Sequence, residues 1–150
     1  MRLLVDTHCW LWFLLSPEKL NPASREALSD SEHVIYFSVA SAWEIVIKAS
    51  LGKLELPQSP SKYIPDRLTQ LGHEQLPILQ EHVLELENLP AHHKDPFDRI
   101  LLVQAQVEDL LLVTADRTLA LYGQPLLWAG PGERPPMGTV EGQPAEPQPA

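Results

Sequence analysis

Five short apolar runs, each separated from the next by a longer segment, constrain the fold of this chain most strongly. Runs of this length with few charges are typical of strands that are buried on both faces of a parallel sheet. The segments between them carry helical patterns, so the sequence predicts an α/β protein, a three-layer α/β/α sandwich on a small parallel sheet. The runs lie at 2–5, 34–37, 75–78, 110–113 and 125–128.

Residues that commonly begin and end helices mark three of the intervening segments. An Asn, Ser or Asp side chain caps a first turn, proline is favoured at the first helical position, and glycine often follows the last turn. The predicted starts are Asn21-Pro22, Ser38 or Ser41, and Asp95-Pro96; Gly52 ends the second of these helices, and the third runs on to Glu108.

The last twenty residues differ in composition from the rest of the chain. They hold six of the 15 prolines and three of the 7 glycines, but almost no large apolar side chains. Such a segment cannot bury enough apolar surface to offset the entropy that is lost on ordering. We therefore expect one globular domain over residues 1–130 and a flexible tail over residues 131–150.

Net charge and cysteine content exclude several classes of protein. With a net charge of -9, the chain lacks the basic surplus of proteins that bind nucleic acid by charge alone. Its single cysteine, Cys9, cannot form an internal disulfide or a cysteine-based zinc site. The apolar runs are too short for a signal peptide or a membrane span. We expect a cytoplasmic protein with no membrane partner.

Four acidic residues are expected to meet at one edge of the predicted sheet. Asp6 directly follows the first apolar run, and Asp116 comes three residues after the end of the fourth. Glu44 and Asp98 lie in the first turns of the second and third helices described above. In a parallel sheet with right-handed crossovers, the C-terminal ends of the strands and the N-termini of the following helices share one edge.

Four carboxylates held together repel one another unless a positive charge lies among them. A divalent cation fits this arrangement, and a site built only from oxygen ligands favours Mg²⁺ or Mn²⁺, as one ion or two. Such ions activate a water molecule and neutralise phosphate charge. The four acids therefore predict a metal site suited to phosphodiester chemistry.

Simpler interpretations stay open for some of these acids. Asp98 and Asp116 can each stabilise a helix by lying near its positive end. Glu44 can pair with Lys48 one turn later on an exposed helix face. Asp6 is the hardest to explain in this way, because a carboxylate at the buried end of a strand costs free energy unless it is paired or bound to a metal.

The acids and their neighbours form stretches whose order and spacing resemble a known family, the PIN-domain ribonucleases. Within that family the resemblance is to the VapC-type toxins of bacterial type II toxin–antitoxin systems, and it spans nearly the whole predicted domain. The stretches are LLVDTH at 3–8, SVASAWEI at 38–45 followed by Lys48 and by LGKL at 51–54, HHKDPFDR at 92–99, and VTAD at 113–116.

This resemblance implies a Mg²⁺- or Mn²⁺-dependent endoribonuclease that forms a homodimer and is neutralised by a cognate antitoxin protein. It implies that Asp6 and Asp98 are the principal metal ligands. Thr114 resembles the hydroxyl residue that the family has near its fourth acid, and Asp95 resembles a supporting position that also caps its helix. The invariant catalytic and metal-binding acids of the family fall on Asp6, Glu44, Asp98 and Asp116.

The cationic and histidine side chains near these acids each have a structural interpretation and a functional one. Arg99, Arg117 and Lys48 either contact RNA phosphates or balance local carboxylates. His92 and His93 precede the third helix and allow a metal or acid/base role, but loop or helix-packing roles are favoured, because adjacent histidines point in different directions.

An apolar stretch at 10–15 predicts a helix that is buried on more than one side. Its outer side is either internal to the domain or in contact with a second copy or an antitoxin segment. Residues 1–130 hold 17 acids and 10 bases, so the acidity belongs to the domain. We therefore expect weak non-specific binding of RNA and a surface that suits a basic antitoxin segment.

Two other functions fit the sequence less well. A phosphatase that uses Asp6 as a nucleophile would need a second acid two residues later, where His8 stands. A non-catalytic or differently acting PIN-like binding module is the remaining alternative. The complete set of four acids argues against it, because a site that had lost its activity would be expected to lose at least one acid.

Overall fold

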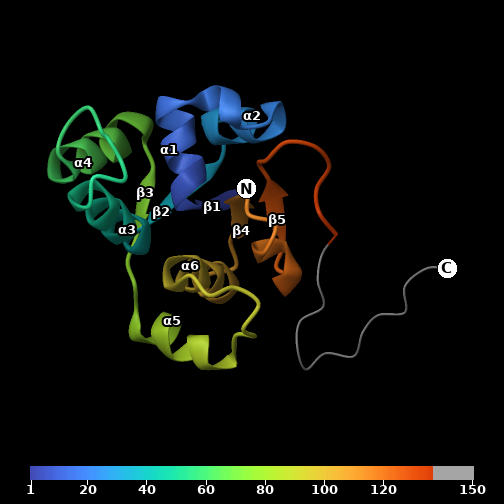
Figure 1. Ribbon diagram of the computed structural model, residues 1–150. Helices are drawn as coiled ribbons and strands as arrows, with labels where there is room; N and C mark the ends of the chain where they lie inside the picture. The colour runs from blue at the N-terminus through green and yellow to red at the C-terminus, as the bar shows by residue number, and fades with distance from the viewer. Residues whose placement is uncertain (137–150) are drawn as a thin grey trace.

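The computed structural model describes residues 1–136 and holds five strands in one sheet (Figure 1). The strand order is β3-β2-β1-β4-β5, and every neighbouring pair is parallel. This confirms the predicted parallel α/β architecture. The strands are β1 (Arg2–Val5), β2 (Val34–Ser38), β3 (Glu74–Leu76), β4 (Leu111–Thr114) and β5 (Leu126–Trp128).

Helices cover both faces of the sheet, which confirms the three-layer prediction. Figure 1 shows α1 and α2 on one side of the strands and α5 and α6 on the other. None of the helices in residues 1–136 is both long and apolar enough to cross a membrane. The α-helices are α1 (Thr7–Leu15), α2 (Pro22–Ser29), α3 (Val39–Ser50), α4 (Pro60–Leu71), α5 (Gln80–Glu85) and α6 (Pro96–Val107); the short 3₁₀ turns are η1 (Pro17–Lys19), η2 (Leu86–Asn88) and η3 (Leu119–Tyr122).

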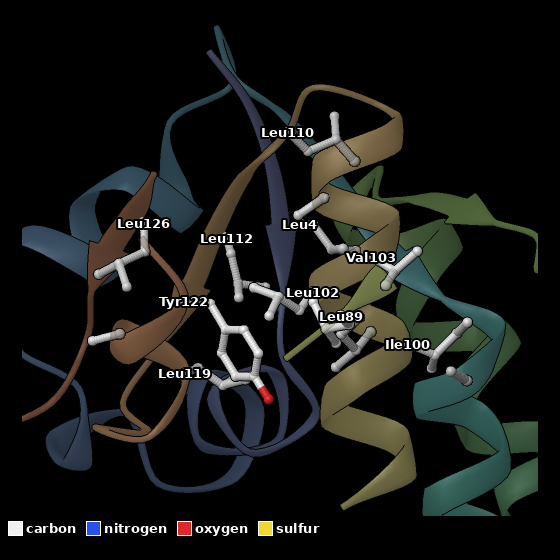
Figure 2. Close-up of a cluster of buried hydrophobic side chains, with 14 of the residues drawn as sticks. Leu4, Leu89, Ile100, Leu102, Val103, Leu110, Leu112, Leu119, Tyr122 and Leu126 are labelled. Carbon is white, nitrogen blue, oxygen red and sulfur yellow. The ribbon is translucent and has the colours of Figure 1, made fainter. Parts of the chain in front are cut away.

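The central strand β1 divides the core between the two helical layers. Leu3 and Val5 belong to the cluster on the side of α1, whereas Leu4 belongs to the cluster on the side of α6, and all three are fully buried. Figure 2 shows Leu4 and Leu112 of neighbouring strands beside Val103 of α6. Burial on both faces explains why the strands are continuous apolar runs rather than alternating ones.

The structure confirms the three predicted helix starts, in which a side chain accepts a hydrogen bond from a backbone N–H of the first turn. Gly52, with φ +72°, follows the last turn of α3 in the left-handed region that favours glycine. Ser41, the alternative start of this helix, lies inside it instead, and its hydroxyl group lies 2.9 Å from the Thr7 hydroxyl group of α1. The confirmed caps are Asn21, Ser38 and Asp95.

The third strand and two helices that were not predicted differ most from the expectation, whereas β2, β4 and β5 differ from their predicted positions by one residue. The third strand was expected at 75–78, but it ends at Leu76 because Pro77 has no N–H to donate to the sheet. Helix α4 contains Pro65, a residue that normally ends a helix, and α5 has only six residues. Helix α4 nevertheless begins at Ser59-Pro60 and is followed by Gly72 with φ +68°, a start and end pattern that was not among the predicted ones, whereas α5 follows Leu79 and has no such pattern.

The predicted tail lies mainly outside the described residues, which end at Pro136. Within 131–136, Pro135 is buried, and the Trp128 indole N–H donates to the Pro131 carbonyl group at 3.4 Å. The first residues after 130 thus contact the domain. The boundary at 130 stays a prediction.

Candidate active site

The register of the central strands brings their C-terminal ends level with one another. Val5 of β1 lies opposite Phe37 of β2 and opposite Val113 of β4. Asp6 and Thr114 follow directly after two of these residues, so they lie side by side at the sheet edge. This is the edge at which parallel α/β proteins place ligands.

Asp6 is a buried carboxylate with two hydrogen-bond donors. It is only 4% exposed, and it caps α1 because its Oδ1 accepts from the Cys9 N–H at 2.8 Å. Its Oδ2 accepts from the Thr114 hydroxyl group at 2.5 Å. Burial raises the pKa of Asp6, and the hydrogen bonds from Thr114 and Cys9 oppose that rise.

Asp98 lies in the first turn of α6, close to several charges. Burial is the largest cause that raises its pKa to about 7, followed by the negative charges of Asp95 and Asp6. The Asp116 charge raises this pKa further, while His93 lowers it. The charged form of Asp98 is therefore disfavoured in free energy, and a nearby cation would offset this cost.

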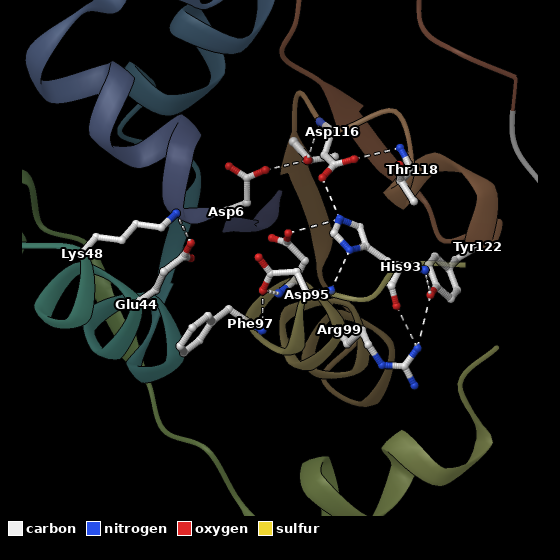
Figure 3. A network of polar contacts seen from close by, with 12 residues as sticks. Asp6, Glu44, Lys48, His93, Asp95, Phe97, Arg99, Asp116, Thr118 and Tyr122 are labelled. Atoms are coloured by element: carbon white, nitrogen blue, oxygen red, sulfur yellow. Dashed lines mark hydrogen bonds and ion pairs between the residues drawn. The ribbon is translucent and has the colours of Figure 1, made fainter. Parts of the chain in front are cut away.

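Asp116 completes a group of three aspartates at the sheet edge. Its backbone N–H donates to the Thr114 hydroxyl oxygen at 3.0 Å, and its Oδ1 accepts from the Thr118 N–H at 2.8 Å. Asp6, Asp98 and Asp116 line one small pocket of about 220 Å³. The structure thus brings together three of the four predicted acids, from three different segments of the chain (Figure 3).

Glu44 lies on α3 beside this pocket and does not line it. Its side chain is buried, and its Oε2 accepts from the Lys48 Nζ at 2.6 Å, as the spacing predicted. The pair is not a surface pair, however, because Glu44 is only 2% exposed. Its second oxygen, Oε1, is buried with no hydrogen-bond partner among residues 1–136. Figure 3 shows this pair on α3, on the other side of Asp6 from Asp116.

His93 contacts two of the aspartates, which the sequence interpretation missed. Its Nε2 lies 2.8 Å from Asp116 Oδ2 and 3.2 Å from Asp98 Oδ2. Its Nδ1 accepts from the Asp95 N–H at 3.1 Å, so the ring proton of the neutral imidazole is on Nε2. His93 therefore donates to the acids, and the prediction that the metal ligands are oxygen atoms only stays a prediction.

A signal for His93 exists in the sequence, although it is weak. The residue precedes the cap of α6 by two positions, and a cluster of acids needs a nearby donor or cation. His92 behaves as predicted, since its ring packs edge-on against Tyr122 with centroids 5.0 Å apart. The two adjacent histidines therefore have different roles: His92 packs against Tyr122, and His93 contacts the acids.

Arg99 donates to backbone carbonyl groups, and among residues 1–136 it forms no ion pair with the acids of the site, while its contact with an RNA phosphate stays a prediction. Its guanidinium group donates to the carbonyl oxygens of Pro90 at 3.0 Å, His93 at 3.3 Å and Leu89 at 3.4 Å. In the same loop, the His93 backbone N–H donates to the Tyr122 hydroxyl group at 2.8 Å. Arg99 therefore supports the site by fixing the loop that carries His93.

Thr114 and Asp95 have the supporting geometry that was expected of them. Thr114 is fully buried and bridges Asp6 and Asp116 through its single hydroxyl group. Asp95 Oδ1 accepts from the Phe97 N–H at 2.8 Å, which places the first turn of α6 and so Asp98. Arg117, the remaining cation, lies over the Trp128 ring at 5.2 Å from its centroid.

Comparisons with known proteins agree with this architecture. The PIN domain family matches residues 3–124 of the chain. A stretch of 59 residues is 39% identical to Ribonuclease VapC16 of Mycobacterium tuberculosis (strain ATCC 25618 / H37Rv). That match covers 39% of this chain and 42% of the relative, so it spans less than half of the relative's length.

A solved structure has a similar fold. It is a domain of a functionally unknown protein from Methanocaldococcus jannaschii DSM 2661, with a TM-score of 0.54 and 14% sequence identity. The similarity covers 89% of this chain and 94% of that domain. At this level of identity the likeness concerns the fold alone.

Proposed function

Since this chain belongs to the PIN domain family, we propose that it is a metal-dependent endoribonuclease of the VapC type. The proposal rests on the family match and on the 39% identity to a protein named as a ribonuclease. In the proposed reaction, water adds across an RNA phosphodiester bond and leaves a 5′-phosphate and a 3′-hydroxyl group.

The observation that carries the proposal is the pocket lined by Asp6, Asp98 and Asp116. The charges of Asp6 and Asp116 raise the pKa of Asp98, and His93 donates to Asp116 from its Nε2. Such a cluster has the chemistry of a divalent-cation site.

The residues present fit Mg²⁺ or Mn²⁺ on a second ground. Glu44 Oε1 is buried without a partner, which costs free energy unless a cation or an ordered water occupies the adjacent space. We propose that Asp6 and Asp98 are the principal ligands of one or two ions, with Glu44 and Asp116 as ligands directly or through water. When bound, such an ion lowers the pKa of a water molecule and neutralises phosphate charge.

The chain's own side chains would orient these ligands. The Thr114 hydroxyl group holds Asp6, and the Asp95 cap fixes the first turn that carries Asp98. His93 donates to Asp116 and so keeps one Asp116 oxygen in a fixed position. Each carboxylate is thus held by a neighbour before a substrate arrives, which is the arrangement that metal ligands generally require.

We further propose that the protein is the toxin of a type II toxin–antitoxin pair, acting in the cytoplasm as a homodimer that a cognate antitoxin neutralises. This part rests on the relative named VapC16. The domain would comprise residues 1–130. A basic antitoxin segment would suit its acidic surface, because the charges are complementary.

Cleavage of RNA by the purified full chain, free of any antitoxin, tests the proposed function. Single-stranded and structured RNA would be incubated with Mg²⁺, with Mn²⁺ or with EDTA. We expect cleavage with either metal, none with EDTA, and a loss of at least about a hundredfold in the Asp6→Asn variant. The matched control is Asp66→Asn, which changes an exposed acid of α4 that pairs with Lys62.

Two results would overturn the proposal. Cleavage that persists in EDTA would exclude the metal-dependent reaction, and full activity in Asp6→Asn would exclude this site. Binding of RNA without any cleavage, in either metal, would instead favour a PIN-like binding module.

A further inference from the structure

A groove with basic side chains lies beside the acidic pocket. It has a volume of about 340 Å³ and is formed by α1, the turn that follows it, α3 and the turn after α3. Three of the chain's five lysines line it, namely Lys19, Lys48 and Lys53. None of the residues that line it is acidic, although the whole chain has a net charge of -9. We call it the lysine groove.

The lysine groove adjoins the pocket of the three aspartates. His8 and Trp12 of α1 line both. A ligand that follows α1 from one to the other therefore meets positive side chains at one end and the proposed metal ligands at the other. This order suits a chain with repeated negative charges, one of which reaches the acids together with a bound cation.

Two of the three lysines keep a free positive charge. Lys48 is paired with Glu44 at 2.6 Å. Lys19 and Lys53 are exposed, and within the described part of the chain neither forms an ion pair. Phosphate groups bind such exposed ammonium groups without having to displace a carboxylate.

The local backbone places Lys53 next to the groove wall. The positive φ of Gly52 turns the chain back after α3, and the Lys53 N–H then donates to the Lys48 carbonyl group at 2.9 Å. On the other wall, Lys19 Nζ lies 5.9 Å from the centroid of the Trp12 ring. Sites for single-stranded nucleic acid combine positive side chains along the strand with aromatic side chains that contact the bases, and the groove has both kinds next to each other.

We propose that the lysine groove binds the single-stranded RNA that flanks the scissile phosphate, an inference that rests on the proposed ribonuclease function. Lys19 and Lys53 contact backbone phosphates, and Trp12 contacts an unpaired base. The bases of an RNA duplex are stacked on one another and cannot lie against a tryptophan ring, so the occupant is an unpaired strand. The charge of the groove disfavours the alternative of a basic protein segment.

Binding of a fluorescein-labelled single-stranded RNA decamer, measured by anisotropy in EDTA so that the RNA stays intact, tests the groove. In the Lys19→Glu/Lys53→Glu variant we expect affinity at low salt to fall by at least about tenfold. The slope of log affinity against log salt should decrease by about 1.4, since each phosphate contact to a single strand contributes roughly 0.7. The control Arg25→Glu/Lys62→Glu makes the same change of charge on exposed residues of α2 and α4, outside the groove. Its slope should match that of the unmodified chain.

The role of Trp12 is tested with two variants, because its half-buried ring also packs against the core. Trp12→Phe keeps an aromatic face, whereas Trp12→Leu keeps only an apolar side chain. We expect Trp12→Leu to bind the decamer about 5- to 150-fold more weakly than the unmodified chain, and Trp12→Phe to keep most of the affinity. Equal affinity of these two variants would overturn the base contact.

Failure of the groove and failure of the ribonuclease function give different results. If the chain cleaves RNA with metal and the lysine variant has the same KM and salt slope as its control, the groove proposal is overturned and the function stands. If the salt slope changes as expected but the chain cleaves RNA with neither metal, the groove proposal is supported and the ribonuclease function is overturned. A polyglutamate peptide that binds more tightly than the RNA, with the same lysine dependence, would make the groove a docking site for an acidic protein segment and overturn the proposal.

Discussion

The Thr114 hydroxyl group and the Asp6 carboxylate form a 2.5 Å hydrogen bond across two neighbouring strands. The Thr114 hydroxyl group donates its proton to Asp6 Oδ2, while its oxygen accepts from the Asp116 N–H. One buried hydroxyl group thus sets the position of two acids at the sheet edge. The contact also supplies part of the stabilisation that Asp6 needs as a buried charge.

Replacing Thr114 with valine should weaken both the fold and the activity. Valine has nearly the same shape, but it removes the partner of the half-buried Asp116 N–H and of Asp6 Oδ2, at a cost of about 1–3 kcal/mol in the free energy of unfolding. Urea unfolding and RNA cleavage would measure the two effects. The matched variant Thr114→Ser keeps the hydroxyl group and should retain most of both properties. If Thr114→Val were as active as Thr114→Ser, the hydroxyl group would have no part in holding the site.

Asp98 should make the metal-free protein less stable as the pH rises. Its pKa is raised from 3.8 to about 7 in the folded chain, so the folded state binds this proton more tightly than the unfolded chain does. The corresponding stability is fully present below about pH 4 and is lost as the pH rises through about 7. Its upper limit is about 4 kcal/mol, which water near the site would reduce.

The Asp98→Asn variant tests this pH dependence, because asparagine does not titrate. In EDTA, we expect the variant to become more stable than the unmodified chain as the pH rises from 4 to 8, by urea unfolding at each pH. The same variant should lose cleavage activity, since it lacks a proposed metal ligand. Parallel stability curves for the two proteins would show that Asp98 has an ordinary pKa.

How far the fold and the site follow from the sequence depends on the range of the interactions involved. Strand positions and caps depend on neighbours along the chain, and Ser38 and Asp95 cap the helices whose starts they predicted. Asp6 and Asp116 met as predicted because parallel strands have a common edge, whichever residues fill the core.

The remaining features depend on contacts between distant segments. His93 reaches Asp116, 23 residues away, only because the loop before α6 is fixed by Arg99. Glu44 and Lys48 were recognised as a pair, but the burial of Glu44 comes from packing of α3 against the rest of the domain. Spacing along the chain predicts neither of these outcomes.

His93 should matter through Asp116 and not as a metal ligand, because its Nδ1 already accepts a hydrogen bond and its Nε2 carries the proton. We expect His93→Ala to lower Mn²⁺ affinity or activity by about 10- to 100-fold, as for other partners of metal ligands. His93→Gln, which keeps an N–H near the position of Nε2, should recover part of the loss. Calorimetry with Mn²⁺ and the cleavage assay would measure both. Complete loss of Mn²⁺ binding in His93→Gln would indicate that the ring is itself a ligand.

Added Mg²⁺ or Mn²⁺ should stabilise the folded chain, and more so at high pH. A metal at about a hundred times its dissociation constant adds roughly 2.7 kcal/mol. Protons compete with the metal for Asp98, so the shift in melting temperature should be larger at pH 8 than at pH 6. Asp98→Asn and Glu44→Gln should reduce the shift, while the surface control Asp66→Asn should not. An equal shift in all of these variants would mean that the metal binds elsewhere.

The pair formed by Glu44 and Lys48 should stabilise the metal-free protein far more than an exposed pair does. Lys48→Met would leave Glu44, which is 2% exposed, as a buried charge without its partner. Loss of one partner of a fully buried pair costs about 3–5 kcal/mol, and we expect less than about 3 kcal/mol here because Lys48 is 35% exposed. The control is Lys62→Met, which breaks an exposed pair with Asp66 at 3.5 Å and should cost less than about 1 kcal/mol. Adding Glu44→Gln to Lys48→Met should restore much of the stability in urea unfolding with EDTA. If Lys48→Met cost no more than Lys62→Met, burial of Glu44 would carry no charge penalty, and its unpartnered oxygen would no longer argue for a cation at this site.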